Sequence, residues 1–421
     1  MDKFVILGGK KLSGTVEISG AKNAALALIP ASLLNSAANK LTNVPEVNDI
    51  YTMIKMMKSL GAKVNFTNHQ VIIDNQNINS QFAPYDLVKK MRASIYVLGP
   101  LLSKYGFAKV SLPGGCAWGP RPVNLHIEAM KKLGADVNFD GGYIIAKTKK
   151  LIGNKIHFDV SSVGATGNAL MASVLAKGET VISNAAIEPE ITSLAKYLVK
   201  MGAKIEGIGS NILNIQGVDE LRGADATIIG DRIEAGTLLI AGAITRSNIS
   251  IKYSEPEYIE SVSSSLEEVG CKLFINNDLI SINSENIELK NQDVTTAVFP
   301  GFPTDMQAQW IALMSIAGGI SKVTDNVYSD RFAHVPELNR LGTNIEVVHN
   351  SAIVKGVKFL KGAKVMSTDL RASASLVLAG LIAEGTTEVL RIYHLDRGYE
   401  KIETKLSQLG AEISRESTSE F

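Results

Sequence analysis

A short phrase that ends a helix-like segment and starts a strand-like one recurs six times along the 421-residue chain. In each copy a glycine follows a run with helical apolar periodicity, and the six are Gly61, Gly134, Gly202, Gly270, Gly342 and Gly410. The gaps between them are 73, 68, 68, 72 and 68 residues. Glycine directly after an amphipathic helix is a C-terminal capping signal, and so regular a spacing predicts a repeated structural unit.

A second type of helix recurs between these glycines, and its sequence is apolar or small on nearly all sides. Aligning the copies places six residues at equivalent positions near the helix starts: Lys22, Arg92, Gly164, Arg232, Asp305 and Arg371. We expect these helices to be buried and the glycine-capped helices to be amphipathic and outside. Strand-like runs complete each unit, at 71–74, 110–112, 143–146, 180–183, 212–215, 249–251 and 353–354. The pattern predicts repeated α/β units around central buried helices, three units to a domain.

The two ends of the chain are expected to meet. The sixth copy stops soon after Gly410, without the strand pair that should follow, and residues 4–23 resemble the segment 352–371 that supplies this pair in the fifth copy. The N-terminal strands should therefore close the sixth unit. We expect one domain at 22–229 and another at 1–21 plus 230–421, because a chain this long exceeds a single core.

Composition excludes several classes of function. A net charge of +1 argues against a protein that coats nucleic acid or binds membranes through basic residues. No signal peptide or membrane-spanning run is recognisable, and two cysteines without a pairing framework favour a reducing compartment, so we expect a cytoplasmic protein. The six histidines show no metal-ligand spacing, and no CxxC pair exists. We expect no metal.

The starts of the buried helices carry charged residues where small apolar ones would suffice. A helix N-terminus already has partial positive charge, so an added Lys or Arg there favours an anionic ligand, which we expect in the cleft between the domains. Arg331 and Arg397 add cations in loops of the second domain. The alternative is that each cation pairs with an acid close to it in sequence, such as Asp369 for Arg371 or Asp231 for Arg232.

Two residues leave alternatives open at this point. Asp305 is either a helix cap or, among cations, an ionised general base. Cys116 lies in the loop LPGGCAWGPRPVNLH at 112–126, which is about four residues longer than its counterparts. It is either a reactive thiol beside Arg121 or a buried filler. Cys271 takes a position that holds alanine in four other copies, so we expect it to be core filler.

The chain resembles the UDP-N-acetylglucosamine 1-carboxyvinyltransferase family of enolpyruvyl transferases over nearly its whole length. The matching motifs are SGAKNAAL at 19–26, MRAS at 91–94, the loop at 112–126, SVGAT at 162–166, DRIEAGT at 231–237, FPTDMQAQ at 302–309, DLRASASLVLAG at 369–380 and HLDRGYE at 394–400. The loop and FPTDMQAQ are the most specific. The resemblance implies two inside-out, prism-like α/β domains, and departs from the family pattern at Trp118, Pro120 and Val160.

The resemblance also implies a reaction: transfer of the enolpyruvyl group of phosphoenolpyruvate to the 3′-hydroxyl of UDP-N-acetylglucosamine, the first committed step of peptidoglycan synthesis. No organic cofactor is implied, and the partners are these two small molecules. The related enolpyruvyl transferase of the shikimate pathway is the nearest rival, but it lacks such a cysteine loop.

The resemblance assigns roles to residues. Cys116 would protonate phosphoenolpyruvate and Asp305 would accept the hydroxyl proton. Arg397 is implied as the third catalytic residue. The residues implied to bind phosphoenolpyruvate are Lys22, Asn23, Arg121, Arg331, Arg371 and Arg397. Those implied to bind the nucleotide sugar are Asn23, Arg92, Arg121, Pro122, Val123, Asn124, Leu125, Ser162, Val163, Gly164, Asp305 and Val327.

Overall fold

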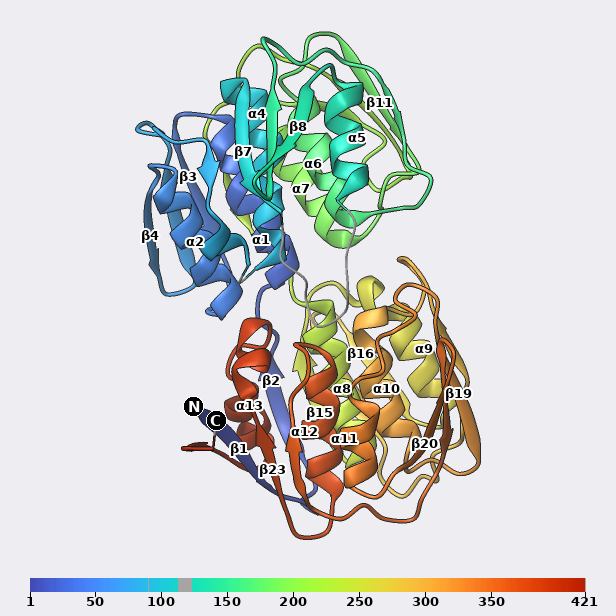
Figure 1. The fold of residues 1–421 in the computed structure, drawn as a ribbon. Helices are drawn as coiled ribbons and strands as arrows, with labels where there is room; N and C mark the ends of the chain where they lie inside the picture. Colours follow the sequence, from blue (N-terminus) through green and yellow to red (C-terminus); the bar gives the residue numbers. More distant parts are fainter. Residues whose placement is uncertain (90, 113–122, 421) are drawn as a thin grey trace. The chain divides into compact units, whose positions relative to one another are not determined.

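The computed structural model describes residues 1–89, 91–112 and 123–420. The chain forms two compact units, which Figure 1 shows as a ribbon. The first unit is Gly20–Ile229, and the second combines Met1–Ser19 with Gly230–Phe421. The sequence predicts domain boundaries at 21/22 and 229/230. The structure places the first at 19/20 and the second at 229/230.

One topology recurs in six four-stranded sheets among the described residues. In each sheet the first strand runs parallel to the second, while the second and third and the third and fourth pair antiparallel. The parallel edge strand comes from the preceding repeat, so neighbouring repeats are joined through their sheets. This confirms the α/β class and the repeat that the glycine spacing predicts.

The first unit contains three of these sheets. Their strands, in sheet order, are β14 (Asp225–Thr227), β3 (Ala38–Thr42), β5 (Gln70–Asp74) and β4 (Lys63–Thr67); β6 (Phe82–Ala83), β7 (Phe107–Ser111), β9 (Tyr143–Lys147) and β8 (Asp136–Asp140); and β10 (Lys155–His157), β11 (Glu179–Ser183), β13 (Ile212–Gln216) and β12 (Lys204–Glu206). The central helices are α1 (Lys22–Ala31), α4 (Leu98–Tyr105) after the 3-10 helix η2 (Arg92–Val97), and α6 (Val163–Ser173). The outer helices are α2 (Asn48–Ser59), α5 (Asn124–Lys132) and α7 (Pro189–Lys200).

The second unit repeats this plan. Its sheets are β2 (Ser13–Glu17), β15 (Asn248–Lys252), β17 (Leu279–Asn283) and β16 (Lys272–Asn276); β18 (Val294–Thr296), β19 (Ile320–Asp325), β21 (Ser351–Lys355) and β20 (Asn344–Val348); and β22 (Lys364–Met366), β23 (Thr386–Leu390), β1 (Asp2–Leu7) and β24 (Glu412–Ser417). Central helices are α8 (Arg232–Ile244), α10 (Gln307–Met314) after η4 (Thr304–Met306), and α12 (Ala372–Ile382). Outer helices are α9 (Glu260–Glu268), α11 (Val335–Arg340) and α13 (Ile402–Gln408), the last preceded by η5 (Ile392–Arg397).

The central helices are buried on all sides, as their composition predicts. In α12 every residue from Ala372 to Leu381 is buried, and α10 is buried along its whole length. Small side chains let three such helices pack closely, and Figure 1 shows them enclosed by the sheets and outer helices. The outer helices keep polar faces toward solvent; α7, for example, exposes Lys196 and Lys200.

The six glycines end the outer helices in the left-handed region, with φ values between 88° and 108°. Residues with a Cβ adopt this region only at a cost, so glycine is the default there. The capping prediction is confirmed at all six positions. The seven strand-like runs also lie within strands β5, β7, β9, β11, β13, β15 and β21, apart from Leu112 at the end of its run.

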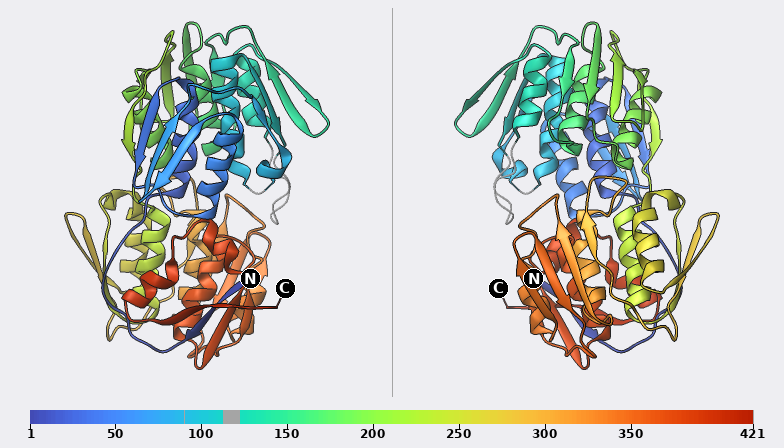
Figure 2. Two further views of the ribbon diagram at one scale, coloured as in Figure 1. Left: turned by 90° about the vertical axis from the view of Figure 1, so that its left-hand side faces the viewer. Right: turned by 90° about the vertical axis from the view of Figure 1, so that its right-hand side faces the viewer.

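The N-terminal strands are shared between two sheets. β1 lies between β23 and β24, with Phe4 opposite Val389 on one side and Arg415 on the other. β2 instead pairs in parallel with β15, the sheet of the fourth repeat. Closure of the sixth repeat is therefore confirmed for β1 and wrong for β2. The two chain ends lie side by side (Figure 2), and the Met1 amino group donates to the Thr418 carbonyl at 3.0 Å.

Candidate active site

The predicted site residues fall into three sets. Cys116, Arg121 and Pro122 lie outside the described residues, as do Trp118 and Pro120. The second unit holds Asp305, Val327, Arg331, Arg371 and Arg397, and the first unit holds the others. The two units are taken in turn.

Asp305 lies in η4, immediately before the buried helix α10. Its neighbour Thr304 donates a hydrogen bond of 2.7 Å from Oγ1 to Oδ2 of Asp325, a fully buried carboxylate at the end of β19. The other oxygen of Asp325 accepts from the backbone N–H groups of Val327 and Tyr328, at 2.9 and 2.8 Å. Asp325 thus ties the segment carrying Asp305 to the loop that carries Val327 and Arg331.

Arg331 is bonded to two carboxylates. Its NH1 donates to Oδ1 of Asp305 at 2.6 Å and to Thr304 Oγ1 at 3.3 Å, and its Nε lies 3.5 Å from Oδ2 of Asp369. Burial disfavours the charged guanidinium, but the nearby carboxylates outweigh it and raise the pKa of Arg331 above its ordinary value. The side chain is therefore a permanent cation with little freedom to move.

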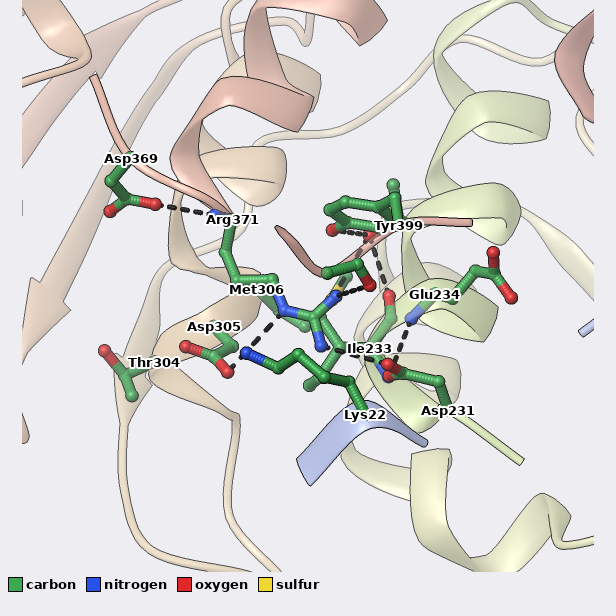
Figure 3. A network of polar contacts seen from close by, with 12 residues as sticks. Lys22, Asp231, Ile233, Glu234, Thr304, Asp305, Met306, Asp369, Arg371 and Tyr399 are labelled. Carbon is green, nitrogen blue, oxygen red and sulfur yellow. Dashed lines mark hydrogen bonds and ion pairs between the residues drawn. The ribbon is translucent and has the colours of Figure 1, made fainter. Parts of the chain in front are cut away.

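Arg371 is the N-cap residue of α12 and is 2% exposed. Figure 3 shows it lying between Asp231 and Asp305, beside Tyr399. NH2 donates to Oδ2 of Asp231 at 3.0 Å, and the guanidinium carbon lies 4.8 Å from the centre of the Tyr399 ring. Nε is 3.9 Å from Oδ2 of Asp305, too long for a hydrogen bond, and has no hydrogen-bond partner among the described residues. This buried N–H therefore has, within the described part of the chain, only the longer electrostatic contact with Asp305.

The cluster is not the uncompensated cationic site that the sequence suggests. Asp231, Asp305 and Asp369 balance the two guanidinium groups of Arg331 and Arg371. The side chain of Asp305 is 27% exposed, against 6% for Asp231 and 5% for Asp369. Asp305 is therefore the most accessible of the three carboxylates and the best placed to meet a bound substrate.

Both guanidinium groups pair with acids that are distant in sequence. Asp231 pairs with Arg371, 140 residues away. Asp369 caps α12 by accepting from the backbone N–H groups of Arg371 and Ala372, at 2.6 and 2.8 Å, and bonds the Arg331 guanidinium. The side-chain partner expected for Arg371 from sequence proximity is thus wrong, because its guanidinium pairs with Asp231 and not with Asp369.

Arg397 lies at the end of η5 and is partly exposed. The neighbouring carboxylate, Asp396, binds Arg415 through two hydrogen bonds of 2.7 and 3.0 Å. On the same short helix, burial and the positive charges of Arg391 and Arg397 lower the pKa of His394 to about 4. His394 is therefore neutral near pH 7 and adds no positive charge beside Arg397.

In the first unit, Lys22 begins the buried helix α1 and is 7% exposed. Its Nζ lies 3.2 Å from Oδ2 of Asp49, near the start of α2. Asn23, the next residue, is the partly exposed position of an otherwise buried helix. The cation is thus held at the end of the helix by an acid from the neighbouring one.

The starts of α5, α6 and η2 come together through His126. Its Nδ1 lies 2.9 Å from the side-chain nitrogen of Asn168, whose oxygen accepts from the Gly99 N–H at 2.9 Å. The Gly99 bond fixes the orientation of the Asn168 amide, so Nδ1 of His126 must accept and the proton lies on Nε2. Burial and the charge of Arg92 lower the pKa of His126 to about 4, which keeps the ring neutral.

The same imidazole fixes the start of α6. A Cβ atom on Gly164 would lie 3.1 Å from the ring atoms Cε1 and Nε2 of His126, so the ring occupies the space that a side chain would need. Ser162 caps the helix by accepting from the Ala165 N–H at 3.3 Å, and Tyr96 Oη donates to the Val163 carbonyl at 3.4 Å. The predicted nucleotide residues Arg92, 123–125 and 162–164 therefore surround one buried histidine.

Among residues 1–89, 91–112 and 123–420, no helix has the length and apolar character needed to cross a bilayer. Within the same residues, no three His, Cys, Asp or Glu side chains are grouped so that they could hold a metal ion. Cys271, the cysteine that the structure describes, is a buried free thiol, and burial raises its pKa to about 12.

Comparison with known proteins agrees with this geometry. A family profile described as EPSP synthase (3-phosphoshikimate 1-carboxyvinyltransferase) matches residues 6–406. Proteins named UDP-N-acetylglucosamine 1-carboxyvinyltransferase match the whole chain: one from Chloroherpeton thalassium is 58% identical over 424 residues, covering 99% of that protein, and one from Chlorobaculum parvum is 55% identical over its full length. The chain belongs to the UDP-N-acetylglucosamine 1-carboxyvinyltransferase family.

Solved structures share the fold of this carboxyvinyltransferase family. The enolpyruvyl transferase NikO from Streptomyces tendae matches with a TM-score of 0.90 and 25% identity, covering 99% of each chain. An EPSP synthase from Acinetobacter baumannii matches with a TM-score of 0.77 and 18% identity, covering 99% of this chain and all of that one. The predicted enolpyruvyl transferase fold is confirmed.

Several residues of the candidate site were not predicted from the sequence. Asp231 and Asp369 were treated only as local partners, and Asp325 and His126 received no role. His126 ends the quoted loop motif, and a histidine at the start of an amphipathic helix was a signal that could have been followed. Asp325 offered little signal, because its four hydrogen bonds depend on Thr296, Thr304 and the turn after β19.

Proposed function

We propose that this protein transfers the enolpyruvyl group of phosphoenolpyruvate to the 3′-hydroxyl of UDP-N-acetylglucosamine and releases phosphate, the first step of peptidoglycan synthesis. Identity of 53–58% with eight full-length relatives that carry the name of this activity supports the assignment. Within the structure, the observation that carries it is the Asp305 carboxylate, which is accessible, bonded to Arg331 and 3.9 Å from Arg371.

The reaction is an addition followed by an elimination. The 3′-hydroxyl oxygen bonds to C2 of phosphoenolpyruvate while C3 gains a proton, which gives a tetrahedral intermediate. Loss of a proton from C3 and of phosphate from C2 then restores the double bond. Asp305 is proposed to accept the hydroxyl proton, and Cys116, outside the described residues, is proposed to deliver the proton to C3.

The anionic groups of the substrates need cations. Arg331 and Arg371 are proposed to hold the carboxylate of phosphoenolpyruvate, since arginine suits the two oxygens of a carboxylate. Lys22, Asn23, Arg121 and Arg397 are proposed to hold its phosphate side. A carboxylate arriving at Arg331 competes with Asp305 for the same N–H groups, so binding would release the base as the substrate arrives.

The nucleotide sugar is proposed to bind a larger set of residues, of which Gly164 and Arg92 lie beside His126. The set is Asn23, Arg92, Arg121, Pro122, Val123, Asn124, Leu125, Ser162, Val163 and Gly164, with Asp305 and Val327 from the second unit. Backbone N–H groups at the starts of α5 and α6 suit anionic oxygens. Gly164 leaves room for the His126 ring, which packs against the start of α6. We also propose a cytoplasmic location, in keeping with two cysteines that have no pairing framework.

The test is the product of a reaction with both substrates. Purified protein incubated with phosphoenolpyruvate and UDP-N-acetylglucosamine should release phosphate and yield a nucleotide sugar heavier by one enolpyruvyl group, as seen by mass spectrometry. Either substrate alone should give neither product. In a parallel reaction, fosfomycin, an epoxide, should add one mass equivalent at Cys116; a peptide map with Cys116 unmodified would contradict an accessible, reactive thiol.

A further inference from the structure

A buried polar network contacts Asp305 and Arg371 from among the central helices of the second unit. Its members are Thr237 on α8, Gln309 on α10 and Tyr399 after η5, with exposures of 0%, 0% and 2%. Figure 3 shows Tyr399 alongside Arg371, with dashed contacts leading away from its hydroxyl. Polar groups this deep are expensive unless they are bonded to one another.

In this network it can be determined which atom donates each hydrogen bond and which accepts it. The Gln309 side-chain nitrogen donates to the backbone carbonyl of Asp305 at 3.0 Å and toward the Tyr399 hydroxyl at 3.1 Å. A backbone carbonyl can only accept, so the orientation of the Gln309 amide is determined.

The remaining protons follow from the same reasoning. Thr237 donates its single hydroxyl proton to the Ile233 carbonyl at 2.7 Å, so it must accept from Tyr399, whose oxygen lies 2.9 Å away. Burial raises the pKa of Tyr399, which keeps the hydroxyl protonated as this arrangement requires.

The two ends of the network touch the groups proposed to act on phosphoenolpyruvate. At one end Gln309 holds the backbone of Asp305. At the other the face of the Tyr399 ring lies 4.8 Å from the Arg371 guanidinium, while the Gly398 carbonyl accepts from Arg371 NH1 at 3.4 Å. The amide oxygen of Gln309 has no hydrogen-bond partner among the described residues, so an apolar side chain would pack there at lower cost. The network thus fixes the positions of Asp305 and Arg371 at some cost in stability.

We propose that Tyr399 and Gln309 are positioning residues for the reaction, Gln309 placing the Asp305 base and the Tyr399 ring placing the Arg371 guanidinium. This inference rests on the proposed function, which gives Asp305 and Arg371 their roles. The hydroxyl of Tyr399 and its ring then have separable effects. The hydroxyl acts through Gln309 on the proton-accepting step, and the ring acts through Arg371 on the binding of phosphoenolpyruvate.

The experiment separates the two parts of Tyr399. Tyr399→Phe removes the hydroxyl and keeps the ring, so kcat should fall about ten- to a hundredfold while KM for phosphoenolpyruvate changes less than about twofold. Tyr399→Leu also removes the ring, and KM for phosphoenolpyruvate should rise about tenfold as well. Thr237→Val removes the Thr237 hydroxyl and should lower kcat. Thr237→Ser keeps a hydroxyl, so its kcat should stay close to that of the wild type.

A matched control removes an equivalent hydroxyl elsewhere. Tyr197 is 1% exposed and its hydroxyl donates to Asn39 Oδ1 at 3.0 Å, in the first unit and away from the residues with proposed roles. Tyr197→Phe should lower the melting temperature about as much as Tyr399→Phe and leave kcat within about twofold of the wild type. Equal losses of kcat in the two variants, or none in Tyr399→Phe, would overturn the proposal.

The wild type distinguishes this failure from failure of the function. If the wild type turns over and Tyr399→Phe matches it, only the positioning role is wrong. If the wild type does not turn over, the function is wrong, and the positioning claim is then judged by crystal structures of Tyr399→Phe and Tyr399→Leu. The Asp305 carboxylate should be displaced in Tyr399→Phe, and the Arg371 guanidinium should be displaced in Tyr399→Leu. Unchanged positions of these groups would contradict the positioning roles.

Discussion

Arg331 and Asp305 are joined by a hydrogen bond of 2.6 Å from NH1 to Oδ1. The proposed general base and a cation proposed to receive the substrate carboxylate are therefore bonded to each other before any substrate arrives. Such a pair keeps the carboxylate ionised and oriented, and it also occupies the cation. Under the proposed roles, a substrate carboxylate that binds Arg331 would release Asp305 at the same time.

The first prediction concerns Asp305 itself. Asp305→Asn keeps the size of the side chain and an oxygen for Arg331, but it cannot accept a proton. We expect kcat to fall by about 10²–10⁴ while the melting temperature changes little. Asp330→Asn is the matched control, because Asp330 is an exposed acid next to Arg331 in sequence. A kcat for Asp305→Asn within a few-fold of that of the control would contradict the role of Asp305 as base.

The second prediction concerns the buried pair of Arg371 and Asp231. Their side chains are 2% and 6% exposed, so removal of one leaves a buried charge without its main partner. Arg371→Met should lower the free energy of unfolding by about 3–5 kcal/mol in urea titrations. Adding Asp231→Asn to that variant should restore part of the loss, with a coupling energy of about 1–3 kcal/mol. Simple additivity of the two changes would show that the pair is not coupled.

The third prediction concerns Lys405, which binds Glu234 at 2.8 Å and the hydroxyl of Ser19 at 2.7 Å. Burial raises the pKa of Glu234 from 4.5, and Lys405 counteracts the rise. A carboxyl whose pKa is higher in the folded state stabilises the fold fully below its unfolded pKa and loses that contribution as the pH increases. Lys405→Met raises the pKa further, so its loss of unfolding free energy should be larger at about pH 8 than at about pH 5.

Two variants control this prediction. Lys405→Arg keeps a cation, so the pH dependence should stay close to that of the wild type. Glu234→Gln in the Lys405→Met background removes the titrating group, so the added pH dependence should vanish. If Lys405→Met lost the same unfolding free energy at both pH values, the ion pair would not be the cause.

The fourth prediction concerns His334, which is fully buried and whose ring nitrogens have no hydrogen-bond partner among the described residues. Burial lowers its pKa from 6.5 to about 4. The unfolded chain then binds a proton between these values while the folded protein does not, so the free energy of unfolding falls as the pH drops from 6.5 to about 4. The contribution of His334 is about 3 kcal/mol at most.

His334→Leu should remove this part of the acid dependence and cost little near neutral pH, since no hydrogen bond is broken. His349→Gln, at an exposed histidine, should leave the acid dependence of the wild type intact. Urea titrations at several pH values measure both. An unchanged slope in His334→Leu would place the acid sensitivity elsewhere.

The repeat could be predicted because its signals are local. The capping glycines, the small apolar helices and the strand runs each depend on a few neighbouring residues, and all were found where the sequence indicated. The exception is β2, which pairs with β15 across more than two hundred residues. The resemblance of residues 4–23 to 352–371 did carry this information, because β22, the second strand of that segment, also pairs in parallel with the next repeat, at β23.

The pairing within the candidate site could not be predicted from local signals. Arg371 lies 140 residues from Asp231, and Arg331 lies 26 from Asp305, so proximity in sequence suggested the wrong acids. The charged positions at the helix starts nevertheless indicated that Asp305 and Arg371 lie near each other, and Arg331 was added by the family resemblance. The sequence did not predict that nearby carboxylates offset the charges of Arg331 and Arg371.

The central claim is that the protein transfers the enolpyruvyl group to UDP-N-acetylglucosamine. The most direct measurement is phosphate release from phosphoenolpyruvate by the wild type, with UDP-N-acetylglucosamine and with shikimate 3-phosphate as the alternative acceptor in separate reactions. The account predicts release with UDP-N-acetylglucosamine and background levels with shikimate 3-phosphate. Release with shikimate 3-phosphate, and none with UDP-N-acetylglucosamine, would contradict it.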